Sequence, residues 1–183
     1  LLETCFMRHL LTPLTCALAL SAGALTSLPA QERHVLTGPT AVIWNIAGEV
    51  RLEPGTGSDV VVELTRGGSD GRRLAVTASR DELRVRYPAD DIVYREGGAS
   101  RWGTTVNVRE DGSFGGGRRV RVRSSGDGME AHADLRILVP RGQRIEVNLA
   151  VGAITVSNVD GDLRLDVASA SVRASGTKGM LVV

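Results

Sequence analysis

Near the end of the chain, a small residue recurs every nine positions and opens the same pattern each time. The four small residues are Gly152, Gly161, Ala170 and Gly179. The third residue of each unit is apolar, as is the fifth: Ile154, Leu163, Val172 and Leu181, then Val156, Leu165, Ala174 and Val183. Alternation predicts strands with one buried face, and the nine-residue period predicts strand and turn recurring as stacked units. We therefore expect Ile154, Leu163, Val172 and Leu181 to form one apolar row that stacks from unit to unit.

The same alternation extends through the earlier part of the chain. Gly48 opens another unit of this form, Gly-Glu-Val-Arg-Leu. Apolar residues also alternate in four other runs: Val42, Trp44 and Ile46; Val60, Val62 and Leu64; Leu83, Val85 and Tyr87; and Ala131, Ala133, Leu135, Ile137 and Val139. We expect Gln143 to Leu149 to pair with the last of these runs. No stretch has apolar residues at helical spacing over three turns, so the domain is predicted to be all-β.

A glycine-rich segment from about 95 to 117 interrupts this rhythm, and it is predicted to be an irregular loop with a brief strand at Thr104–Val108. The predicted fold is a single-stranded β-solenoid, similar to a β-helix, with short strands and Gly-rich turns over 35–183. Because Val183 falls partway through a unit, we expect that the full protein has further coils that are truncated here.

The first thirty residues are predicted to lie outside the fold. Residues 1–6 precede Met7 and are interpreted as an upstream artefact. Residues 7–30 contain a short basic start and an apolar stretch, which predicts a secretory signal peptide. A retained membrane anchor is the alternative, although the apolar stretch is short for a span. Cys5 and Cys16 both lie in this leader, so the mature chain would have no disulfide.

Composition narrows the function classes. Hydrophobic residues make up 42% of the chain and aromatic residues only 3%, so the core must consist mainly of Val, Leu, Ile and Ala. The formal net charge of +1 argues against a nucleic-acid-binding protein, which would have a strongly basic domain.

No group of residues predicts catalysis, a metal site or a cofactor. His132 alternates with Ala131 and Ala133 and is expected to be exposed, and His34 is expected in a flexible lead-in. The candidate carboxylates Asp90, Asp91, Asp160 and Asp162 lie beside Pro or Gly, which indicates turns. The glycine-rich stretches lack the repetition of a calcium-binding repeat and the Gly-Lys-Ser/Thr of a phosphate loop.

The strongest candidate for an interaction surface is basic. Arg118, Arg119, Arg121 and Arg123 are predicted to form a stripe on the outer face of one strand, with Trp102 nearby for stacking on a sugar. Such a surface would suit envelope polysaccharide, lipid headgroups or an acidic partner protein. The alternative is that these arginines keep a strand face soluble and protect a sheet edge.

Three segments and the leader resemble a bacterial adhesin-like family of extracytoplasmic β-solenoid domains of unknown function. The segments are Asn45–Leu52, Ala131–Pro140 and Ala150–Val156, and the resemblance covers nearly all of 35–183. It implies a coil of short strands in the cell envelope and brings no catalytic residues. The chain departs from the family in ending early.

These observations predict an exported, non-enzymatic scaffold, located in the periplasm, at the cell surface or secreted, with no transmembrane span after signal cleavage. Two other functions stay open. One is a carbohydrate-active β-helix enzyme of the lyase or hydrolase type, which would require carboxylates and basic residues in one groove. The other is a sensor or regulatory domain that recognises envelope components.

Overall fold

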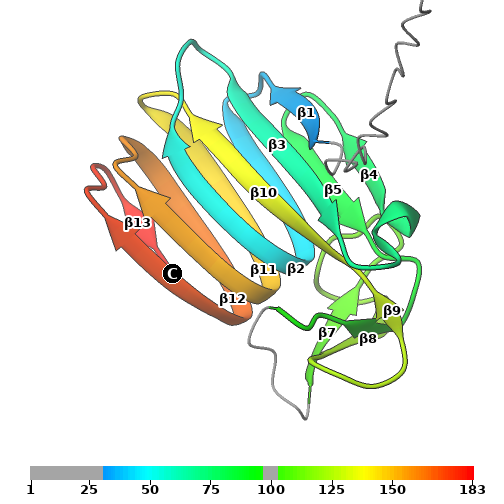
Figure 1. Cartoon of the computed structure of the whole chain (residues 1–183). Helices are drawn as coiled ribbons and strands as arrows, with labels where there is room; N and C mark the ends of the chain where they lie inside the picture. The colour runs from blue at the N-terminus through cyan, green and yellow to red at the C-terminus, as the bar shows by residue number, and fades with distance from the viewer. Residues whose placement is uncertain (1–30, 97–102) are drawn as a thin grey trace, which may run out of the picture.

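The computed structural model describes residues 31–96 and 103–183, and it is all-β, with strands in two sheets (Figure 1). The predicted leader and Trp102 lie outside the described residues. The described residues include one turn of 3₁₀ helix, Gly71–Arg73, and no helix long and apolar enough to cross a bilayer. The prediction of an all-β chain is therefore confirmed.

The larger sheet contains nine strands. Its main path runs β1 (Gln31–Leu36), β3 (Val60–Gly67), β10 (His132–Val139), β2 (Thr40–Pro54), β11 (Gln143–Ser157), β12 (Gly161–Ser175) and β13 (Leu181–Val182). A branch adds β5 (Glu82–Arg86) beside β2 and β4 (Ala75–Ala78) beside β5. The smaller sheet has the order β7 (Thr104–Val108), β8 (Arg118–Arg123), β6 (Asp91–Val93), β9 (Met129–Glu130).

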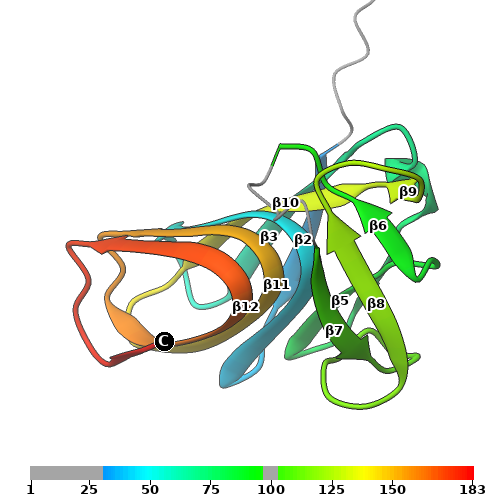
Figure 2. The ribbon, with the colours of Figure 1, turned by 90° about the horizontal axis from the view of Figure 1, so that it is seen from below.

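The three longest strands, β2, β11 and β12, bend at their centres, so that one sheet folds over into two layers (Figure 2). Before the bend, β2 pairs with β5, and after it β2 pairs with β10. The β11–β12 ladder is interrupted at the bend, between the pair Leu149–Val167 and the pair Val151–Ser169. Aliphatic side chains of both halves, such as Ile43, Val50, Val147 and Ile154, meet in a single buried core.

Glycine occupies the bend because the neighbouring backbones approach very closely there. A Cβ on Gly152 would lie 1.9 Å from the carbonyl oxygen of Gly48, and a Cβ on Gly48 would lie 1.9 Å from that of Ala133. Both glycines also have positive φ angles, 142° and 144°. No L-residue with a Cβ can occupy either position without moving the backbone.

A buried hydrogen-bond network holds the same bend. The Tyr87 hydroxyl donates to Asn45 Oδ1 or to the Ala47 carbonyl, each 2.8 Å away, and accepts from the Ala47 amide at 3.3 Å. Asn45 Nδ2 donates to the Ala133 carbonyl at 2.7 Å. Along β2, pairing with β5 ends at Trp44 and pairing with β10 begins only at Val50, and these bonds satisfy backbone groups of Ala47 and Ala133 in that gap. Burial raises the pKa of Tyr87 well above its usual value, so this hydroxyl stays protonated.

The nine-residue units pack differently from the predicted single row. In parallel register, Ile145 pairs with Leu163 and Leu163 with Leu181, so strands repeat every 18 residues. Ile154 instead lies between Val50 and Val172. Residues nine apart therefore lie in different layers, on either side of the bend. Residues 18 apart lie in the same layer, on neighbouring strands. The expected row therefore splits into two rows, one in each layer.

Two further expectations about faces and pairing are wrong. In β2, Ala41, Ile43 and Asn45 are fully buried, while Val42 and Trp44 lie on the other face; Ile46, at the bend, is buried as predicted. Trp44 packs edge-to-face on Phe114 at 5.3 Å and donates to Glu82. The strand β11 does not pair with β10, because β2 lies between them. The three other alternating runs are buried as predicted.

Replacing Gly152 with alanine should lower the free energy of unfolding by about 3 kcal/mol or more, because the methyl group collides with the Gly48 carbonyl. Gly142→Ala is the matched control, since Gly142 also has a positive φ but nothing lies within 4 Å of its Cβ position. Its cost should be about 1 kcal/mol. Urea unfolding measures both, and equal losses would contradict the close approach.

Replacing Tyr87 with phenylalanine should cost about 1–3 kcal/mol, because Asn45 and Ala47 lose their buried partner. The substitution should also change the alkaline limb of the stability curve. The folded chain retains the Tyr87 proton above pH 10, where the unfolded chain loses it, so stability falls as the pH rises. Urea unfolding between pH 8 and 11 should show a shallower decline for Tyr87→Phe than for the wild type.

Candidate functional site

The strand β8 directs its arginines to two different sides. Arg118 shares a face with the buried Val120 and Val122, whereas Arg119, Arg121 and Arg123 occupy the opposite face. The predicted basic surface therefore consists of an outward group of three arginines and one arginine that faces the other way. Strand alternation requires this division, because successive side chains point to opposite faces.

Arg118 ties the smaller sheet to the segment that follows β5. Its guanidinium donates to the backbone carbonyls of Tyr87 and Ala89 and to the Asp90 carboxylate. Three acceptors from one short segment, residues 87–90, hold this side chain in place. Arg118 thus has a structural role, and its neighbour Tyr87 belongs to the network at the bend.

On the outward face of β8, only one of the three arginines is neutralised by an ion pair within the described residues. Arg123 pairs with Asp91 at 3.0 Å and donates to the Asp127 carbonyl. Arg119 and Arg121 are exposed, and neither belongs to an ion pair within the described residues. On the adjacent strand β7, their register partners are Asn107 and Thr105, which are also exposed. Two cations and two neutral hydrogen-bonding side chains therefore form a polar patch, which we call the β8 outer face.

A cavity of about 490 Å³ lies on the other side, where β4, the end of β5 and the 108–112 loop meet Arg118. Its charged lining consists of four arginines and two carboxylates: Arg73, Arg86, Arg109, Arg118, Asp90 and Glu110. Arg118 pairs with Asp90, and Arg73 lies 3.4 Å from Asp70. Within the described residues, Arg86, Arg109 and Glu110 belong to no ion pair. The lining therefore has an excess of two positive charges, four against two.

The candidate carboxylates do not gather in one groove. Asp90 and Asp91 are consecutive, and they pair with Arg118 and Arg123 on opposite sides of the smaller sheet. Asp160 and Asp162 lie at the start of β12, where Asp162 Oδ1 accepts from the Met180 amide and Asp160 pairs with Arg141. Asp160 lies between β11 and β12, as the turn interpretation expects, whereas Asp162 is the second residue of β12 and the turn interpretation is wrong for it. Asp90 and Asp91 have ion-pair partners that the turn interpretation did not foresee.

The histidines are more ordered than the sequence suggested. His132 is buried, with its ring 5.0 Å from that of Tyr94, because it lies where β10 begins against the smaller sheet. The expectation of an exposed His132 is wrong. His34 lies within β1 and not in a flexible lead-in, 3.6 Å from Glu32. Among the described residues, no cluster of three or more His, Cys, Asp or Glu is arranged to hold a metal ion.

Sequence reasoning missed the cavity. Arg73, Arg86 and Arg109 come from three separate segments, and no spacing in the sequence connects them. The sequence did contain a signal for the division of the β8 arginines. In a strand, Arg118 alternates onto the same face as Val120 and Val122. Comparisons with protein-family models, curated proteins and solved structures found no match for this chain. Any assignment of function therefore depends on the geometry of these two surfaces.

The two kinds of β8 arginine should respond differently to substitution. Arg118→Gln should lower the free energy of unfolding by about 1–2 kcal/mol, because the Tyr87 and Ala89 carbonyls lose a charged donor. Arg121→Gln, on the outer face, should change it by less than about 0.5 kcal/mol. Thermal unfolding of the two variants makes the comparison, and equal effects would contradict the division.

Proposed function

We propose that this protein is an exported, non-enzymatic β-solenoid of the cell envelope, and that its β8 outer face binds an acidic polysaccharide. The single observation that carries the binding proposal is the pair Arg119 and Arg121. They are exposed side by side, with Asn107 and Thr105 next to them on β7. On the other side, Asp91 is the register partner of Arg121, and its carboxylate is paired with Arg123. Arginine donors suit sugar carboxylates, and neutral side chains suit hydroxyl groups.

The solenoid proposal is supported by the parallel strands β11, β12 and β13, in which equivalent residues are 18 apart. Such a scaffold is rigid because each strand bonds to the next along its length. A rigid, non-catalytic support is the role that this construction favours.

A polysaccharide fits the β8 outer face better than a lipid surface or a protein. The patch has no exposed apolar side chain to insert among acyl chains or to form the centre of a protein interface. Its affinity would come from charge-assisted hydrogen bonds, which weaken as salt screens exposed charges. Anionic vesicles and acidic proteins are therefore the comparison ligands in the test.

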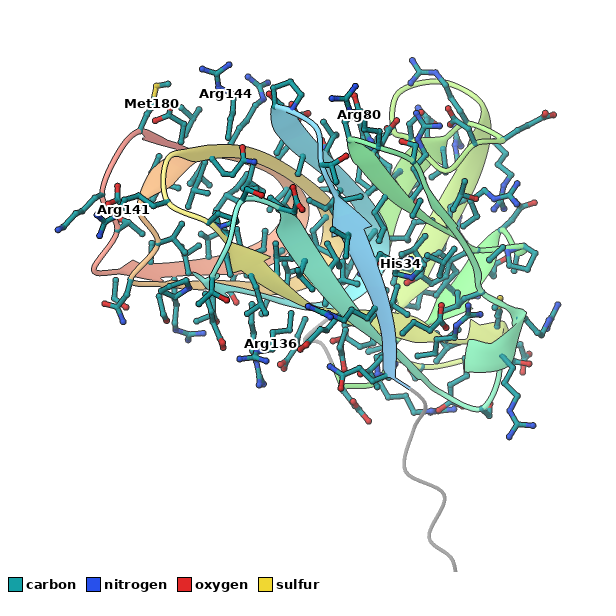
Figure 3. The ribbon with its side chains drawn as sticks, turned by 90° about the horizontal axis from the view of Figure 1, so that it is seen from above. His34, Arg80, Arg136, Arg141, Arg144 and Met180 are labelled. Atoms are coloured by element: carbon teal, nitrogen blue, oxygen red, sulfur yellow. The ribbon has the colours of Figure 1, made fainter. Side chains whose placement is uncertain are left out.

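Replacing both Arg119 and Arg121 with glutamine should weaken retention on an immobilised polyuronate by roughly fivefold and reduce its dependence on salt. The matched control is Arg141→Gln with Arg144→Gln, which removes the same charge near the β10–β11 turn (Figure 3). The control pair should retain binding. Equal losses in both double variants, or tighter binding to anionic vesicles than to polyuronate, would refute the proposal.

One observation favours the carbohydrate-active alternative: two carboxylates, Asp90 and Glu110, line the same cavity as four arginines. Many glycoside hydrolases use two carboxylates that flank the scissile bond. Asp90 is bonded to Arg118, whereas Glu110 belongs to no ion pair among the described residues. Incubating the protein with oligouronides and measuring new reducing ends or unsaturated products decides between binding and turnover.

A further inference from the structure

We propose that the cavity between β4, β5 and the 108–112 loop is a binding site for a single acidic sugar, a hexuronate. This site goes beyond the polysaccharide contact proposed for the β8 outer face, since it lies on the opposite side of that strand. Its volume of about 490 Å³ falls in the range of small-molecule sites, roughly 300–1,000 Å³.

The cavity requires an anion because its positive charge is not neutralised internally. Arg86 and Arg109 line it without a carboxylate partner among the described residues. Arg109 is oriented by the Phe114 carbonyl, to which its Nη1 donates at 2.7 Å, and Gly112 lies against the Arg86 stem. Arg86 at the end of β5 and Arg109 in the 108–112 loop therefore line one opening, where a single carboxylate can contact both.

The lining also selects for hydroxyl groups on the same ligand. Glu110 has no described cationic partner, and Asp90 keeps one carboxylate oxygen outside its bond to Arg118. Ionised carboxylates only accept hydrogen bonds, so they would repel a bare multivalent anion and attract a ring with hydroxyl donors. A sugar acid provides both a carboxylate and several hydroxyl donors on one ring, whereas acetate provides only the charge.

The apolar part of the lining suits the carbon face of a sugar ring. Ala75, Pro88 and Val108 contribute it, next to the charged rim. Arg118 can also contact a ligand at the rim. Its three bonds to protein acceptors use three of its five N–H donors, so two remain available. A rigid site with an apolar wall and a few directed polar groups is typical of ligand pockets.

The test is titration of the full chain with glucuronate, followed by NMR or calorimetry. Glucose, sodium acetate and inorganic phosphate are the comparison ligands. Glucuronate should bind saturably and at least tenfold more tightly than each of the other three, since only it combines the carboxylate with hydroxyl groups. If acetate or phosphate binds equally well, the cavity is a general anion site and the proposal is wrong. If glucose binds as tightly as glucuronate, the arginines do not contribute to binding and the proposal is wrong.

Two variants locate the site. Arg86→Gln should weaken glucuronate binding about tenfold and bring it close to that of glucose. If Arg86→Gln lowers the thermal midpoint of unfolding, Arg109→Gln is the second variant, and it should also weaken glucuronate binding. Arg141→Gln, which lies outside both proposed surfaces, is the matched control, and it should leave glucuronate binding unchanged. Unaltered binding in folded Arg86→Gln and Arg109→Gln variants would overturn the proposal, even if polyuronate retention still depends on Arg119 and Arg121.

Discussion

The close approach of neighbouring backbones at the bend determines the architecture of this protein. The carbonyl oxygens of Ala133 and Gly48 occupy the places where the next strand's residue, Gly48 and then Gly152, would have a side chain. This contact lets three long strands turn at one level, so a single sheet supplies both layers of the core. In β12 the corresponding residue is Ala170, which pairs with Gly152 and has no positive φ. The requirement for glycine at the bend therefore does not extend to β12.

The bend also explains why polar side chains lie in an otherwise aliphatic core. Where β2 bends, its neighbour changes from β5 to β10, and backbone groups of Ala47 and Ala133 in the gap bond to side chains instead. Asn45 and Tyr87 supply them, and their own burial is tolerable because they are fully hydrogen-bonded. Tyr87 is also the residue whose carbonyl accepts from Arg118. A short chain of contacts thus joins the bend of the large sheet to the arginine strand of the small one.

This connection gives the two candidate surfaces a common support with separate chemistry. One side of β8 faces outward with exposed arginines, while the other side places Arg118 at the wall of a cavity. The two binding proposals are therefore independent, because a substitution on one surface removes no contact from the other. Their rigidity comes from the sheets beneath them, since both lie on strands or on loops with ordered hydrogen bonds.

The sequence by itself determined the all-β character, the buried faces of runs such as Val60 to Leu64, and the strand at Thr104–Val108. These features follow from local alternation and from the absence of helical spacing, which depend only on neighbouring residues. Only the tertiary structure decided that the apolar row splits into two, that Asn45 is buried while Trp44 packs outward, and that His132 lies under the smaller sheet. It alone assembled the cavity from Arg73, Arg86 and Arg109. The physical reason is that the nine-residue period reflects only the spacing between one layer and the next. The layer in which a residue lies, and its neighbour there, depend on where distant strands bend.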